Sequence, residues 1–98
     1  HADIHGCTAL WGAAWKGRVD AIRALLAAGA EVDHADNTGE TALYAAAMFG
    51  EVEAIRALLQ AGADINRADN NGRTPLAAAR ANNHEAAVLA LVQAGATE

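Results

Sequence analysis

The most reactive side chains of the chain gather near its start, where His1, His5 and Cys7 form the pattern H-x-x-x-H-x-C. Imidazole and thiolate groups bind zinc, but a structural zinc site needs four ligands in a firm arrangement. We expect these three side chains to lie near a frayed terminus and on turn tips. A Cys–His nucleophile pair would also need a third group to orient the base, and no oxyanion donors are implied. We therefore predict no metal site, no catalytic residue and no cofactor.

Charge argues against a nucleic acid partner, and the pattern of apolar residues argues against a membrane. Among 98 residues, 12 are Asp or Glu and 7 are Lys or Arg, which gives a formal net charge of −5. Binding to phosphate backbones needs clustered Lys and Arg, and here they are scattered. No apolar run approaches the roughly 20 residues that span a bilayer. The single cysteine, Cys7, cannot form an intrachain disulfide, which favours an intracellular, cytoplasmic setting.

Residue types recur along the chain with a period of 33. Residues 3–35 match residues 36–68 at 19 of 33 positions. Such a period is the signature of a repeat architecture, in which each unit is one supersecondary element. The strongest recurrences are Asp3, Asp36 and Asp69; Gly6, Gly39 and Gly72; Thr8, Thr41 and Thr74; Leu10, Leu43 and Leu76; and Gly29, Gly62 and Gly95.

Each unit starts with the pattern Asp-x-x-Gly-x-Thr. Asp at the first position of a tight turn accepts backbone hydrogen bonds, and Gly at the fourth tolerates the exit geometry. The Thr predicts the N-cap of a first helix, and Pro75 suits the first helical position of the third unit. We expect the first helices over residues 9–16, 42–49 and 75–82.

A second helix is predicted after a short break in each unit. From Val19 and from Val52, apolar residues fall at i, i+3, i+6 and i+7, which is one helical stripe. Short extended pieces such as Val32-Asp33 should then lead into the next turn.

Glycine, or asparagine as the next-best residue, suits the positive φ that is expected at the break between the two helices of a unit and at the end of the second helix. The breaks are expected at Gly17, Gly50 and Asn83, and the helix ends at Gly29, Gly62 and Gly95.

A turn followed by two antiparallel helices, at period 33, resembles the ankyrin repeat. The family pattern is close to D-x-x-G-x-T-P-L-H-x-A-A-x-x-G, followed by V-x-x-L-L-x-x-G-A. This chain reads D-I-H-G-C-T-A-L-W-G-A-A-W-K-G, D-N-T-G-E-T-A-L-Y-A-A-A-M-F-G and D-N-N-G-R-T-P-L-A-A-A-R-A-N-N over its three units. The resemblance covers residues 3–96. It implies an all-α ankyrin-repeat solenoid of three helix-turn-helix units with short β-turn fingers.

We therefore expect a single ankyrin-repeat domain over residues 1–98, with repeats at 3–35, 36–68 and 69–98. The third repeat resembles a C-terminal capping repeat, because it lacks the glycine between its helices and carries Leu89 where the others have arginine. Its last helix is less polar than a cap should be.

The first repeat has no visible cap before it in the sequence. Its outward face should then expose apolar surface such as Leu10 or part of the alanine-rich helix. We therefore expect self-association through this uncapped N-terminal repeat face.

The chain departs from the family pattern where the histidine after T-P-L is expected. Trp11, Tyr44 and Ala77 stand there. In the family this histidine bonds between neighbouring repeats, so we expect Trp11 and Tyr44 to pack between repeats, with their polar tips in need of partners.

The resemblance implies a protein-interaction module and not an enzyme, with a partner protein bound in the concave groove of turn tips and inner helices. The binding positions are those that the family pattern leaves variable, and the first two repeats differ at every one. They are Ile4, His5, Cys7, Trp15 and Lys16 in the first unit, Asn37, Thr38, Glu40, Met48 and Phe49 in the second, and Asn70, Asn71, Arg73, Ala81 and Asn82 in the third.

Among these positions, Trp15, Met48 and Phe49 predict an apolar patch on the groove floor. Tryptophan is enriched at binding hot spots and methionine adapts its shape. The alternative is that these side chains pack on one another as ordinary half-buried residues. Two other functions also stay open: a structural or self-associating repeat fragment, and an engineered or excised scaffold without a natural partner.

Overall fold

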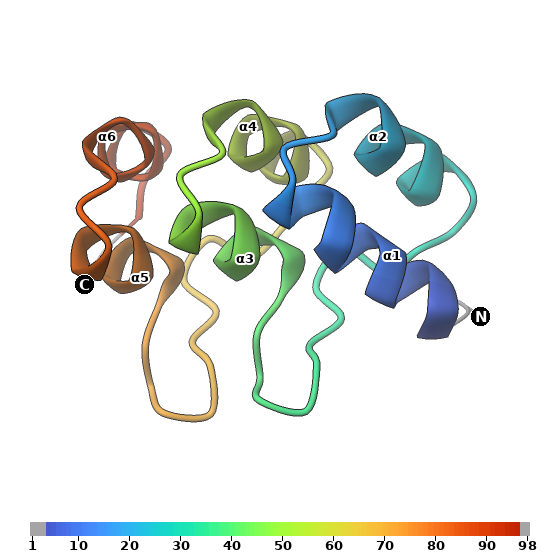
Figure 1. The fold of residues 1–98 in the computed structure, drawn as a ribbon, viewed down its shortest axis with the longest axis horizontal. Coiled ribbons are helices and arrows are strands. Elements are labelled where there is room, and N and C mark those ends of the chain that lie inside the picture. The colour runs from blue at the N-terminus through green and yellow to red at the C-terminus, as the bar shows by residue number, and fades with distance from the viewer. Residues whose placement is uncertain (1–3, 97–98) are drawn as a thin grey trace.

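The computed structural model describes residues 4–96, with the side chains of residues 9–96, and this part of the chain contains six α-helices and no strand. The helices form three antiparallel pairs, which confirms the all-α prediction. In Figure 1, α2, α4 and α6 form an outer row and α1, α3 and α5 an inner row. The bounds are α1 Ile4–Trp15, α2 Val19–Ala27, α3 Ala42–Met48, α4 Val52–Gln60, α5 Pro75–Ala81 and α6 Glu85–Gln93.

The inner helices α3 and α5 begin at the predicted threonines. The hydroxyl oxygen of Thr41 accepts a hydrogen bond from the backbone N–H of Tyr44, and that of Thr74 accepts one from Ala77, each at 3.2 Å. These bonds satisfy backbone N–H groups that the first turn of a helix leaves without a partner. Pro75 occupies the first helical position of α5, as predicted.

The first inner helix differs from the prediction, because α1 begins at Ile4 and not at Ala9. Residues 4–8 are therefore helical and form no turn finger. The later units place Asn directly after the turn aspartate, and Asn favours turns over helix. The first unit has Ile4 and His5 there, and neither residue competes with helix formation in this way.

The outer helices end in the Schellman motif. After α2, the N–H of Gly29 donates to the carbonyl of Leu26 and that of Ala30 to the carbonyl of Leu25. Gly29 has φ 102°, and the same arrangement closes α4 and α6. The breaks within the pairs also have positive φ: 70° at Gly17, 72° at Gly50 and 61° at Asn83.

Two long loops, the fingers, project from the inner row on the side away from the outer row (Figure 1). We define them as residues 31–41 and 64–74. At the tip of the first finger, Oδ1 of Asp36 accepts hydrogen bonds from the N–H groups of Thr38 and Glu40, each at 2.9 Å. Asp69 accepts equivalent bonds in the second finger.

The piece expected to be extended at Val32-Asp33 is instead a turn, in which the N–H of His34 donates to the carbonyl of Glu31 at 3.3 Å. This turn forms the start of the first finger. The equivalent bond in the second finger joins the N–H of Arg67 to the carbonyl of Asp64.

The core lies between the two rows of helices and runs through all three units. Leu43 and Leu76 are fully buried, and so are Ile22 and Ile55 of the outer row. Leu10 is also buried, with 1% of its surface exposed, so the expectation that it lies open at the N-terminal face was wrong. Leu76, in the last unit, is equally buried. Burial of an inner-helix leucine therefore does not need a neighbouring unit on both sides.

Truncation of Leu43 tests this core. Leu43→Ala should lower the free energy of unfolding by about 2–5 kcal/mol, because the side chain is completely buried and the cavity would not collapse fully. Chemical denaturation followed by circular dichroism measures the loss. Arg23→Ala on the exposed side of α2 is the control and should change stability little. A loss below about 1 kcal/mol at Leu43 would contradict the core assignment.

Candidate binding surface

Two aromatic side chains from different units contact one another at the ends of the inner helices. Trp15 is the last residue of α1 and Phe49 is the C-cap of α3. Their ring centroids are 5.4 Å apart with an interplanar angle of 55°, a tilted geometry that aromatic pairs favour. Trp15 is 38% exposed and Phe49 44%. The pair is therefore both packed and available from outside.

A positive charge stands beside this pair. Nζ of Lys16 lies 5.4 Å from the centroid of the Trp15 ring, within the range of a cation–π interaction. Met48, the last residue of α3, is half-buried. We call Trp15, Lys16, Met48 and Phe49 the aromatic patch.

Three acidic side chains of the fingers, Asp36, Glu40 and Asp69, have shifted pKa values. Partial burial raises the pKa of Asp36, but hydrogen bonds from the Thr38 hydroxyl and from the N–H groups of Glu40 and Thr38 outweigh it, so the pKa stays below its ordinary value. Burial, and then the nearby charge of Asp36, raises the pKa of Glu40. The hydrogen bond from the N–H of Arg73 is the largest of several effects that hold the pKa of Asp69 low.

Tyr44 links the second unit to the third. Its ring is buried, and its hydroxyl hydrogen-bonds to the carboxylate of Asp69. Burial, together with this bond and the charge of Asp69, raises the pKa of Tyr44 to about 12. The prediction that Tyr44 packs between repeats is thus confirmed. Trp11, one unit earlier, is half-buried, and its indole N–H has no hydrogen-bond partner among the described residues.

Several predicted binding residues of the second and third units have their side chains engaged within the scaffold. The Thr38 hydroxyl donates to Asp36, and the Asn82 amide donates to the carbonyl of Ala78. The Asn70 amide donates to the carbonyl of Asn37 at 2.9 Å, which ties the two fingers together. Asn37, Asn71, Arg73 and Ala81 are exposed, whereas Glu40 is half-buried.

In the first unit, Ile4, His5 and Cys7 lie on α1 and not on a turn tip, which corrects their predicted placement. Their side chains are outside the described part of the structure. His1 also lies outside the described residues. Among the described residues, no group of three or more His, Cys, Asp and Glu is close enough to hold a metal ion.

Sequence reasoning missed the role of two residues that cover the breaks within the pairs. A Cβ atom on Gly17 would lie 2.5 Å from Oε1 of Glu51, and one on Gly50 would lie 2.7 Å from Nδ1 of His84. Both glycines have positive φ. Gly50 is also required for close approach of the next unit, because the His84 ring leaves no room for a Cβ atom, whereas the flexible carboxylate end of Glu51 can move away from Gly17. The signal was present in the sequence, since Glu51 and His84 are themselves separated by 33.

Comparison with known proteins identifies the class. A family model described as ankyrin repeats, in three copies, matches residues 10–97. The chain therefore belongs to the ankyrin repeat family, whose members are generally protein–protein interaction modules and typically not enzymes. No curated protein matches the chain in sequence. In the part of the chain that the structure describes, no helix is long and apolar enough to cross a membrane.

The bond between Tyr44 and Asp69 gives a prediction about stability and pH. Tyr44→Phe should lower the free energy of unfolding at neutral pH by about 1–2 kcal/mol, because a hydrogen bond to a carboxylate is lost. Because the folded-state pKa is raised to about 12, the stability that this group contributes is present below its unfolded pKa of about 10 and is lost as the pH rises through about 12.

The chain has one tyrosine, so tyrosinate absorbance reports this group alone. The folded protein should titrate near pH 12, and the denatured chain near 10. Comparison of denaturation curves for the two proteins between these pH values checks the linkage. Titration of the folded protein near pH 10 would rule out the bond to Asp69.

Proposed function

We propose that this chain binds a partner protein through its inner surface, with the aromatic patch as the principal contact. The observation that carries the proposal is that Trp15 and Phe49 stay 38% and 44% exposed although they contact each other. Exposed apolar surface of this kind is enriched at sites of protein interaction. Both positions differ between the first two repeats, where most scaffold positions agree.

The aromatic pair is suited to an apolar anchor from the partner. The two rings hold each other in place, so little side-chain entropy remains to be lost on binding. Met48, which precedes Phe49 in the sequence, adds a deformable apolar side chain. We infer that the partner places an aliphatic or aromatic side chain against these rings.

Charged groups around the patch supply orientation. Lys16 stands beside Trp15, while Glu40 lies at the base of the first finger and Arg73 on the second. Charges that stay partly or fully in contact with water contribute little to affinity but favour one register over others. A partner that carries an acidic group near its apolar anchor and a basic group toward the first finger would match them.

Truncation of the rings tests the proposal. Trp15→Ala and Phe49→Ala should each weaken a partner more than about tenfold, since hot-spot residues lose at least ~2 kcal/mol on truncation. Helical circular dichroism and the melting temperature should stay nearly unchanged, because both side chains face outward. The partner is found by affinity capture with the intact chain against the double variant, and its affinity is then measured by calorimetry.

Arg23→Ala on the outer row is the matched control and should leave binding intact. The proposal fails if the two truncations unfold the protein, because the rings would then belong to the core. It also fails if a captured partner is indifferent to both truncations but is lost on mutation of the outer row.

A further inference from the structure

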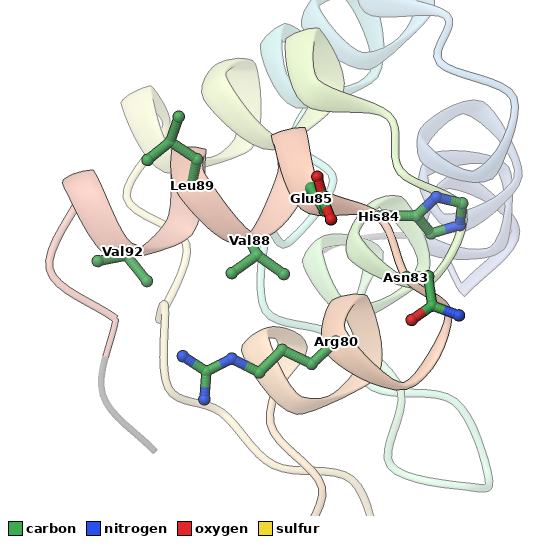
Figure 2. Close-up of a pocket in the computed structure, with 7 residues that line it drawn as sticks. All are labelled: Arg80, Asn83, His84, Glu85, Val88, Leu89 and Val92. Carbon is green, nitrogen blue, oxygen red and sulfur yellow. The ribbon is translucent and has the colours of Figure 1, made fainter.

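The outward side of the last helix carries an uncovered apolar surface. Leu89 is 57% exposed and Val92 46%, and Val88 beside them is half-buried. These side chains line a hollow of about 400 Å³. Figure 2 shows Val88 and Val92 along its upper edge, with the Arg80 side chain extending from α5 beneath them. We call Val88, Leu89 and Val92 the α6 ridge.

The internal repeat shows that this side of a unit is normally an interface. Val88 stands 33 residues after Ile55 and 66 after Ile22, and both isoleucines are fully buried where a further unit packs on theirs. Leu89 occupies the position of Arg23 and Arg56, both of which are exposed. The third unit therefore leaves an interface position uncovered and adds an apolar side chain where the other units are charged.

A second copy stacked head to tail would not fit this surface in the way one unit follows another. Arg80 stands where the first two units have Ala14 and Ala47, which are completely buried. Stacking would bury the Arg80 charge, at a high cost in desolvation.

Asn83 raises the same obstacle. It stands in the place of Gly50, where the next unit approaches so closely that a Cβ would lie 2.7 Å from Nδ1 of His84. Asn83 carries a Cβ atom at the equivalent position, so a following unit could not come as close there. The occupant of the α6 ridge must therefore approach in another geometry.

We propose that the α6 ridge is a dimer interface, on which α6 of a second copy packs antiparallel about a two-fold axis. Val88, Leu89 and Val92 follow Glu85 at i+3, i+4 and i+7, which places all four side chains on one stripe of the helix. Such a stripe can pack against its own copy, as a two-fold interface requires.

The charges at the rim of the hollow complement each other in this geometry. Glu85 is at the start of α6, and Arg80 reaches under the helix toward Val92 (Figure 2). An antiparallel pair brings the Val92 end of one α6 to the Glu85 end of the other. The Arg80 side chain of each copy then faces Glu85 of the second copy, and the ion pair forms twice.

The oligomeric state of the 98-residue chain tests this interface. Sedimentation equilibrium from roughly 10 μM to 1 mM should show a reversible monomer–dimer equilibrium, because a single helix face is at the small end of specific interfaces. Leu89→Arg restores the residue type that the first two units carry at this exposed position, so the fold should be kept. It should weaken dimerisation at least tenfold, while Trp15→Ala should leave the dimer intact.

A charge exchange tests the antiparallel geometry. Arg80→Glu and Glu85→Arg should each weaken the dimer, and the two together should restore it, with circular dichroism to verify the fold. Ala24→Glu, on the exposed part of α2 at the opposite end of the stack, should have no effect.

Three results would overturn the proposal. The first is a strict monomer up to 1 mM. The second is an open-ended assembly, or a dimer that Ala24→Glu breaks, because either result indicates head-to-tail contact. The third is a double charge variant that fails to restore association. Each can be recognised whether or not the aromatic patch binds a partner.

Discussion

One helix pair of this chain cannot bury its own apolar surface, and the rest of the structure follows from that constraint. The outer-row residues Ile22 and Ile55 are fully buried because a further unit packs on each, whereas Val88 in the third unit stays partly open. Stability in such a stack is the sum of unit and interface contributions, and three units have only two interfaces. Positions at these interfaces therefore hold alanine, isoleucine or leucine at nearly the same place in each period. The positions that vary between units are those that take no part in these interfaces.

Hydrogen bonds between units fix how one unit is placed on the next, which apolar packing alone does not specify. Asn70 donates from its backbone N–H to the carbonyl of Thr38 and from its side chain to the carbonyl of Asn37, which ties one finger to the other. The hydroxyl of Tyr44 reaches Asp69 from the inner row. Both sets of bonds join the second unit to the third, and they place charged finger residues beside the inner helices. The fingers are therefore oriented parts of the inner surface, although the described residues contain no strand in them.

Local signals in the sequence were sufficient for most of the fold. The cap at Thr41 and the positive φ at Gly50 depend on a few neighbouring residues, so their residue types indicate the geometry. The early start of α1 at Ile4 was missed because the repeat pattern assigned the first unit a turn that its own residues do not favour. In the candidate site, the exposure of Phe49 followed from its place in the repeat. The engagement of Asn70 did not, because its partner lies 33 residues earlier and is met only once the units stack.

The aromatic pair belongs both to an interface between units and to the exposed surface. Trp15 and Phe49 come from different units, so their contact lies across the interface that holds α1 against α3. Because both rings remain exposed, a partner that covers them would touch two units at once and oppose any movement of one against the other. Binding and stacking would then stabilise each other, since a ligand that binds only the folded stack shifts the unfolding equilibrium by mass action. A stack of three units has only two interfaces, so stabilisation of one of them is a large part of the total interface stability.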